Sequence, residues 1–287
     1  MISRMSGTPR RSCSLTLVAA ALALAAAGCR EPADSRPVVA VSVPPQAYFA
    51  ERLAGDLVDV LVMIPPAANP VHHAPTVAQR RALARARLYF AIGHPAFPFE
   101  RTWLRRTLDG NDRVEVVDVF AGVERRPGDP HLWLSPTAAR RMAERMAAAL
   151  AELLPAHRAT VEANLATVAA EIDAVERDLV AVLGDARGKR FFVFHPAWGY
   201  FAAAYGLEQV AVERDGKEPD ARTLAELIRT ARAAGVDTLF VEPQFDRASA
   251  EVVAGEVGAE LAVADPLAYD WGDNLRRFAA RVAAAAR

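Results

Sequence analysis

The amino-acid sequence predicts an α/β protein with two β/α lobes, each with a mainly parallel sheet, joined by one long rigid helix. Three observations lead to this prediction. Short β-branched runs alternate with helical segments in both halves of the chain, one amphipathic segment near the middle is much longer than the others, and a short pattern near the start recurs after it. Strands that alternate with helices form parallel sheets covered on both faces.

Proline and glycine set the boundaries of the expected elements. The run 38–43 is rich in valine and stops at Pro44-Pro45, and the helix that follows closes at Gly55. The expected strands lie at about 38–43, 58–64, 88–92, 114–119, 190–194, 209–212, 238–241 and 261–264. The expected helices lie at about 47–54, 76–87, 99–108, 136–153, 155–183, 198–205, 220–234, 247–257 and 271–285.

The segment 155–183 carries one apolar stripe in alternating steps of four and three residues. Its members are Val161, Leu165, Val168, Ile172, Val175, Leu179 and Val182. A helix of this length extends about 44 Å, which is longer than a single lobe. The alternative is a coiled-coil dimer seam, but a stripe of three heptads with no repeat elsewhere favours a helix that spans both lobes.

A short pattern occurs once in each half of the chain. Pro45 is followed by Tyr48-Phe49-Ala50 and Gly55, and Pro196 is followed by Tyr200-Phe201-Ala202 and Gly206. Each copy fits a strand, a proline stop and a short helix that ends at glycine. The repetition supports two lobes of similar construction.

Length and composition agree with this organisation. The 287 residues suffice for two modest domains, and a hydrophobic content of 52% excludes a disordered chain. A formal net charge of −1 provides no polybasic surface for nucleic acid. The expected divisions of the chain are a lipoprotein signal peptide at 1–28, a tether at 29–37, an N-terminal lobe at 38–135, a helical segment at 136–187 and a C-terminal lobe at 188–287. We expect the protein to be a monomer.

The first 28 residues have the features of an export signal. Arg4, Arg10 and Arg11 precede a short apolar run, which is too short to span a bilayer. The run ends in Ala26-Ala27-Gly28-Cys29, which resembles the lipobox of bacterial lipoproteins and predicts that Cys29 is lipidated. The alternative is a plain signal-peptidase site. Since Cys13 leaves with the signal peptide, the mature chain has no pair of thiols for a disulfide and no thiolate metal site.

Polar side chains follow several of the expected strands directly. His195 follows the strand at 190–194, Glu242 follows 238–241 and Asp265 follows 261–264. Because open parallel sheets bind ligands at the carboxyl ends of their strands, these residues are candidates for one site. Glu242 is either a ligand or a carboxylate at the start of a helix, and the second interpretation is favoured.

Histidine is concentrated in the same kind of loop. His72, His73, His94, His131 and His195 lie in loops that follow expected strands, whereas His157 lies in a helical segment. Imidazole and carboxylate without thiolate suit zinc, and also manganese or iron. Among these residues His131 and His195 are the strongest ligand candidates, since each lies beside a proline and large apolar residues, where an unpartnered imidazole is costly.

Four motifs in this order resemble those of the zinc and manganese substrate-binding proteins of ABC importers, the cluster 9 family. They are Asp129-Pro130-His131-Leu132-Trp133-Leu134-Ser135-Pro136, Phe194-His195-Pro196-Ala197-Trp198-Gly199-Tyr200-Phe201, Gly216-Lys217-Glu218-Pro219 and Asp265-Pro266-Leu267. The resemblance extends from about residue 38 to the C-terminus. It implies two lobes joined by one long helix, with His131, His195 and Asp265 as metal ligands.

The resemblance also implies a function. It indicates a lipid-anchored receptor, on the periplasmic or cell-surface side of a bacterial membrane, that captures zinc and delivers it to an ABC importer permease. His195 stands where manganese-type members often carry glutamate, which favours zinc over manganese as cargo. Within the class, the alternative is a manganese or iron receptor.

One motif departs from the family pattern. Members usually carry Pro-His-x-Tyr/Phe-Glu-Pro-Thr, whose histidine is the first ligand, and here the sequence is Pro70-Val71-His72-His73-Ala74-Pro75-Thr76. Val71 therefore occupies the ligand position. The expectation is that His72 or His73 reaches the metal after a small shift of the loop, with His94 as another substitute.

Two other classes of function stay open at this point. A zinc-dependent hydrolase also uses three protein ligands and an open position, and Glu242 is the obvious candidate for its general base. An adhesin-like or metallochaperone role is the third option.

Overall fold

A computed structural model describes residues 1–2, 36–213, 221–233, 235–245 and 247–285. The predicted signal peptide after residue 2, Cys29 and most of the tether lie outside the described residues, as does the motif Gly216-Lys217-Glu218-Pro219. None of the helices in the described ranges combines the length and the apolar character needed to cross a membrane.

The N-terminal part of the described chain forms a parallel sheet. Its strands are β1 (Val38–Val41), β2 (Asp59–Val62), β3 (Leu88–Ala91) and β4 (Glu115–Asp118). They lie in the order β2-β1-β3-β4, with Val38 opposite Asp59 in one pair and Val39 opposite Leu88 in the next. The carboxyl ends of the strands therefore meet at one edge of the sheet.

A second parallel sheet repeats this strand order. Its strands are β5 (Arg190–Val193), β6 (Glu208–Ala211), β7 (Thr238–Val241) and β8 (Glu260–Val263), in the order β6-β5-β7-β8. The helix after the inner strand β1 ends at Gly55 (φ 55°), and the helix after the inner strand β5 ends at Gly206 (φ 66°). The two sequence patterns thus occupy equivalent places in two similar lobes, as predicted.

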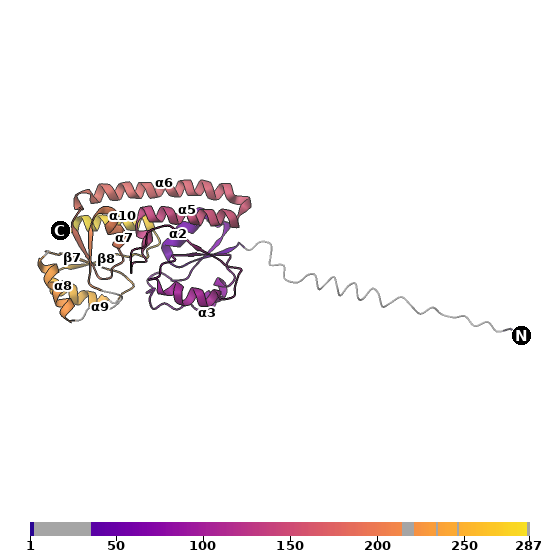
Figure 1. The fold of residues 1–287 in the computed structure, drawn as a ribbon, viewed down its shortest axis with the longest axis horizontal. Helices are drawn as coiled ribbons and strands as arrows, with labels where there is room; N and C mark the ends of the chain where they lie inside the picture. The colour runs from indigo at the N-terminus through magenta and orange to yellow at the C-terminus, as the bar shows by residue number, and fades with distance from the viewer. Residues whose placement is uncertain (3–35, 214–220, 234, 246, 286–287) are drawn as a thin grey trace. The chain divides into compact units, whose positions relative to one another are not determined.

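Most of the helices agree closely with the expected ranges. The helices are α2 (Pro44–Ala54), α3 (Val77–Leu83), α4 (Arg105–Leu108), α5 (Pro136–Leu153), α6 (Arg158–Leu183), α7 (Gly199–Tyr205), α8 (Ala221–Ala233), α9 (Arg247–Val257) and α10 (Trp271–Ala285). Of these, α3 and α4 are shorter than expected. Short turns of other helical types lie at Gly55–Leu57, Glu100–Leu104, Leu132–Leu134, Pro155–His157 and Gly184–Ala186. Figure 1 shows α2 and α3 on opposite sides of the first sheet.

Strand β5 shows why the second sheet needs helices on both faces. Phe191 packs edge-on against Phe278 of α10, with ring centroids 5.7 Å apart. The next residue, Phe192, belongs to a separate apolar cluster that includes Ala231 of α8 and Ala250 of α9. Because successive side chains of a strand point to opposite faces, this continuous apolar run is buried on both sides.

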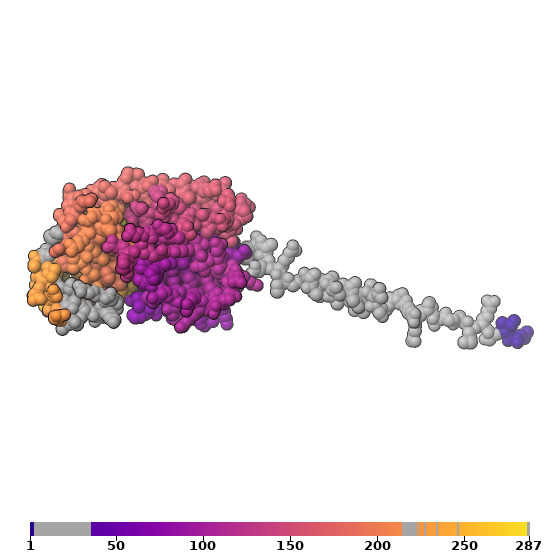
Figure 2. Space-filling view, in the orientation of Figure 1, coloured from indigo at the N-terminus to yellow at the C-terminus, as the bar shows by residue number. Residues whose placement is uncertain are grey.

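Helix α6 links the two lobes (Figure 1). On α6, Glu171 forms an ion pair with Arg52 of α2 in the N-terminal lobe, and Asp178 forms one with Arg276 of α10 in the C-terminal lobe. Figure 2 shows the α5 and α6 segments covering one side of both lobes. The prediction of one long connecting helix is therefore confirmed, whereas the limits of the lobes stay a prediction.

The apolar stripe of α6 differs from the prediction at its end. Val182 is 44% exposed, and Leu183 is buried instead at 1%. Steps of four and three residues average 3.5, but a straight helix has 3.6 residues per turn, so the buried face drifts along the helix. A further step of four from Leu179 reaches Leu183.

Two helix boundaries were also predicted imperfectly. The expected helix at 99–108 begins with the wider π turn Glu100–Leu104, where the buried Glu100 carboxylate accepts hydrogen bonds from Ile92 N (2.7 Å) and Gly93 N (2.9 Å). Helix α3 begins after an N-terminal cap at Thr76, whose Oγ1 accepts a hydrogen bond from Gln79 N. It ends near residue 83, because the chain turns there to place β3 beside β1.

Candidate metal-binding site

The carboxyl edge of the second sheet gathers four ionisable side chains. His195 follows β5, Glu213 follows β6, Glu242 follows β7 and Asp265 follows β8. Each lies within two residues of the end of its strand. The topology of the sheet therefore brings together residues that are up to 70 positions apart in the sequence.

His195 is held on three sides. Its ring stacks on Phe245, with centroids 4.6 Å apart and planes 25° apart. Its Nδ1 lies 2.5 Å from Glu213 Oε2, and its backbone N–H donates to Glu242 Oε2 at 3.3 Å. Burial lowers the pKa of His195 below its ordinary value, and the hydrogen bond to Glu213 opposes this shift. A lowered pKa keeps the imidazole neutral, which is the form that binds metals.

His131 is held in a similar way from the long loop that follows β4. Its Nδ1 lies 2.9 Å from Asp129 Oδ1, and its ring meets Trp133 edge-on at 5.4 Å. Gly199, at the start of α7, permits this arrangement. A Cβ atom there would lie 2.4 Å from Asp129 Oδ2, so a larger residue would displace the carboxylate that orients His131.

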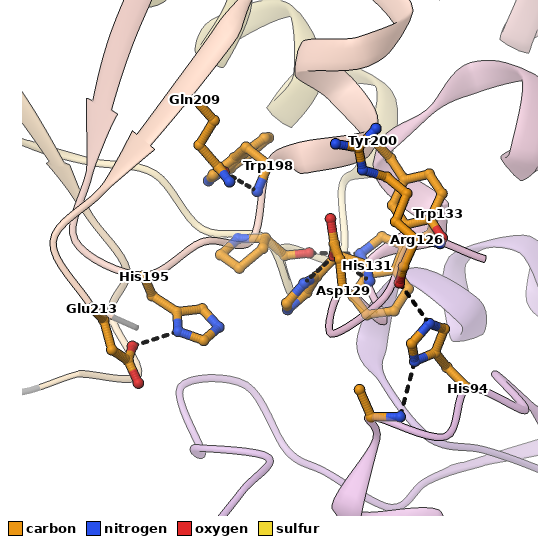
Figure 3. A network of polar contacts seen from close by, with 12 residues as sticks. His94, Arg126, Asp129, His131, Trp133, His195, Trp198, Tyr200, Gln209 and Glu213 are labelled. Carbon is orange, nitrogen blue, oxygen red and sulfur yellow. Dashed lines mark hydrogen bonds and ion pairs between the residues drawn. The ribbon is translucent and has the colours of Figure 1, made fainter. Parts of the chain in front are cut away.

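The structure brings His131 and His195 together. Their ring centroids are 5.6 Å apart and their planes are 80° apart, and Figure 3 shows both rings with their carboxylate partners. Since each histidine uses Nδ1 for a carboxylate, its Nε2 is left for a ligand. Histidines that bind metals usually have this pattern, in which the second nitrogen donates to a carboxylate or carbonyl.

Asp265 also has one oxygen committed to the protein. Its Oδ1 accepts hydrogen bonds from Gln244 Nε2 at 2.7 Å and from Leu267 N at 2.9 Å. The neighbouring Pro266 carbonyl accepts from Trp133 Nε1 at 2.8 Å, which connects this segment to the one that carries His131. Oδ2 is the atom available for a cation.

A cleft of about 840 Å³ lies between the lobes, and its wall includes Val71, Phe97, His131, His195 and Phe245. Asp265 itself does not line the wall, but its neighbours Pro266 and Leu267 do. Within the described ranges, no three histidine, cysteine, aspartate or glutamate side chains lie close enough together to hold a metal ion. The two histidines therefore meet in the structure, but Asp265 and the first loop do not complete a group of three ligands with them.

The loop that departs from the family pattern presents Val71 to the cleft. Val71 is 50% exposed and lines the wall, whereas His72 and His73 do not line it. His72 is exposed. The ring of His73 stacks on Phe99 at 6.0 Å, and its Nε2 is buried with no hydrogen-bond partner among the described residues.

His94 has no nitrogen left for a metal in this structure. It is 3% exposed, its Nδ1 accepts from Ala96 N at 3.0 Å, and its Nε2 lies 3.1 Å from the Arg126 carbonyl. The imidazole thus connects two loops of the N-terminal lobe (Figure 3). This arrangement argues against His94 as the substitute ligand.

Glu242 does not start a helix, contrary to the favoured interpretation of the sequence. Helix α9 begins only at Arg247. The Glu242 side chain is 1% exposed and contacts the backbone of His195. Burial raises its pKa well above the ordinary value for a glutamate. Its Oε2 accepts the backbone N–H of His195, and its Oε1 is buried without a described partner.

The sequence analysis gave no role to Glu213, Asp129 or Gln244, which hold the three candidate ligands. Glu213 could have been found by the rule that selected His195, because it follows strand β6 at the same edge of the sheet. Asp129 and Gln244 required the folded chain, since nothing in their spacing shows which side chain they contact.

Comparison with known proteins identifies relatives along most of the chain. The zinc-binding lipoprotein AdcA of Streptococcus pneumoniae serotype 4 is 28% identical over 274 residues, which cover 86% of this chain and 53% of AdcA. The chain thus spans about half the length of this relative. The high-affinity zinc uptake system protein ZnuA of Brucella abortus is 30% identical over 149 residues, covering 51% of this chain and 44% of that protein.

Solved structures share the fold. A crystal structure of ZnuA has a TM-score of 0.82 and 39% sequence identity, covering 88% of this chain and 99% of that one. The protein FpvC of Pseudomonas aeruginosa, solved in complex with Mn²⁺, has a TM-score of 0.75 at 22% identity, covering 88% of this chain and 98% of FpvC. The family profile described as "Zinc-uptake complex component A periplasmic" matches residues 39–283. This chain is therefore a member of the ZnuA family.

Proposed function

We propose that this protein captures zinc in the cleft between its lobes and delivers it to the permease of an ABC importer. The observation that carries the proposal is the meeting of His131 and His195, with Nδ1 of each beside a carboxylate and Nε2 left for the cargo. Imidazole nitrogens favour zinc, whereas manganese prefers sites made mainly of oxygen ligands.

Four residues complete the proposed ligand set. His131, His195 and Asp265 bind the ion, and His72 or His73 adds a donor from the N-terminal lobe when the loop shifts. His73 is the better candidate, because its buried Nε2 lacks a partner among the described residues and gains one by turning to the metal. The ligands come from both lobes, so binding draws the walls of the cleft together.

The location of the protein follows from the same function. An importer receptor works outside the cytoplasmic membrane, and Cys29 provides a lipid anchor on the periplasmic or cell-surface side. We infer that the protein acts as a monomer, since its long helix α6 buries its apolar stripe within the chain.

The hydrolase alternative lacks a suitable base. A general base must be ionised and must reach the metal-bound water. Glu242 has a raised pKa and lies beneath the backbone of His195. The ZnuA family consists of transport receptors, not enzymes. The alternatives left are a manganese or iron receptor of the same class and an adhesin-like or metallochaperone role.

We expect the mature protein to bind zinc at least about tenfold more tightly than manganese, because zinc forms stronger bonds to imidazole nitrogen. The measurement is metal analysis of the purified protein followed by competition calorimetry with both ions. Tighter binding of manganese than of zinc would show that the cargo has been assigned wrongly.

Zinc should be released when the pH falls. Protons and zinc compete for the same imidazole nitrogen, and burial lowers the pKa of His195 below its ordinary value of about 6.5. Binding should therefore be constant near neutral pH and weaken only below that value, by about tenfold per pH unit for each histidine that gains a proton. The zinc affinity measured from about pH 8 to pH 5 tests this. An affinity independent of pH would argue against histidine ligands.

The Cys29→Ala variant should move from the membrane fraction to the soluble fraction. Without the thiol there is no site for acyl chains, whose burial provides the membrane affinity. Fractionation of cells followed by immunoblotting measures the distribution, with Cys13→Ala as the matched control. Retention of Cys29→Ala in the membrane would exclude the anchor.

A further inference from the structure

Glu213 is a buried carboxylate beside a proposed zinc ligand. It is 5% exposed, and its side chain meets His195 Nδ1 at 2.5 Å. A buried carboxylate is costly unless it is paired, and the described contacts of this side chain give it His195 as its partner. Its backbone N–H donates to the Phe194 carbonyl at 2.8 Å, so the main chain of Glu213 is fixed directly beside the residue that precedes His195.

Contacts on several sides fix the orientation of the His195 ring, so the choice between its two neutral tautomers is what is left to determine. Phe245 covers one face at 4.6 Å, and the backbone N–H of His195 donates to Glu242. In Figure 3, Glu213 lies on the side of His195 that faces away from His131. A carboxylate at Nδ1 requires the proton on that atom, which leaves the lone pair on Nε2, on the side of His131.

We propose that Glu213 is a positioning residue that fixes His195 as the Nδ1–H tautomer, so that Nε2 is ready to bind zinc in the cleft. The inference rests on the proposed function of the site. Glu213 would not touch the ion. The imidazole ring lies between them, with the ion at Nε2 and the carboxylate at Nδ1. Asp129 has the corresponding place beside His131.

The experiment compares three variants of the full mature chain with the wild type. Glu213→Ala removes the acceptor, Glu213→Gln retains a side chain of the same size, and Glu251→Gln is the control. Glu251 belongs to an exposed ion pair with Arg247 on α9, and losing its charge should change neither measurement. ¹⁵N chemical shifts of the His195 ring in the metal-free protein report the tautomer, and calorimetry reports the zinc affinity.

In the wild type, His195 should be in the Nδ1–H form. Glu213→Ala should give a mixture of tautomers and an affinity about 10–100-fold lower, the usual loss for a residue that supports a metal-binding histidine. For Glu213→Gln, the zinc affinity should stay near the wild-type value if the ring spectra show the Nδ1–H form. It should fall if they show a mixture of tautomers. If Glu213→Ala does not fold, Glu213→Leu, which removes the acceptor while keeping a side chain of similar size, replaces it.

Three results would overturn the proposal. The first is a Glu213 variant that loses the Nδ1–H form while keeping its zinc affinity. The second is a variant without an acceptor at this position, Glu213→Ala or Glu213→Leu, that keeps both the Nδ1–H form and the affinity. The third is a loss as large as that of His195→Ala with the tautomer unchanged, which would make Glu213 itself a ligand. If the wild type binds no zinc, the proposed function fails, while the ring spectra of the metal-free protein still decide whether Glu213 orients His195.

Discussion

Replacing His131 or His195 with alanine should lower the zinc affinity by more than about 100-fold. Residues that only support a ligand contribute about 10–100-fold, and a ligand contributes more, because its loss removes a metal–nitrogen bond. The two rings lie 5.6 Å apart as one pair, so the loss of either leaves a single imidazole of that pair for the ion. Isothermal titration of the metal-free variants with zinc measures the effect.

The other histidines provide a graded comparison. The double variant His72→Ala with His73→Ala should weaken binding clearly but less, because its loop has to move to reach the ion. His94→Ala should have a smaller effect, since both ring nitrogens already bond to the backbone. His157→Ala, in the turn between α5 and α6, should have none. Equal losses for His157→Ala and His131→Ala would mean that the site has been located wrongly.

The Leu179→Ala variant should destabilise the protein by about 2–5 kcal/mol, the usual cost of a cavity left by a buried leucine. Leu179 is fully buried, one turn along α6 from Val175. Helices α6 and α10 are close together at Val175, since a Cβ on Gly272 of α10 would lie 3.0 Å from Val175 Cγ2. A cavity at this contact leaves little room for the neighbours to relax.

Val180→Ala is the matched control for this change. Val180 is the next residue of the same helix and is 56% exposed, so its truncation should alter the free energy of unfolding by less than about 0.5 kcal/mol. Urea unfolding of the metal-free variants, followed by circular dichroism, measures both. If the two variants lose stability equally, the stripe of α6 does not face the core.

Most of the fold could be predicted because its signals are local. Helix α5 occupies the predicted residues, and β7 lies exactly where its β-branched and aromatic residues placed it, since both elements have clear periodicity and proline or glycine limits. The predictions failed where a tertiary contact changed a local preference. The turn at Glu100 widens around a buried carboxylate, and Val182 turns outward because the helical period is not 3.5.

The site was predictable only in part, for a similar reason. His131, His195 and Asp265 follow strands or belong to motifs, so the sequence identifies them as candidates. The partners of these residues depend on which strands are neighbours in the sheet. Glu213 meets His195 because β5 pairs with β6, and no pattern within 18 residues of sequence shows which carboxylate meets which ring.

Helix α6 determines how the proposed zinc capture could be converted into an optical signal. Because α6 forms ion pairs with α2 of one lobe and α10 of the other, the distance between the backs of the two lobes is fixed by a single rod. Two fluorophores attached there would report almost no change on binding. A single polarity-sensitive dye on the cleft wall, for instance at a cysteine replacing the half-exposed Val71, would pass from water into a closed contact. The useful reporter is therefore one that senses local hydration instead of distance.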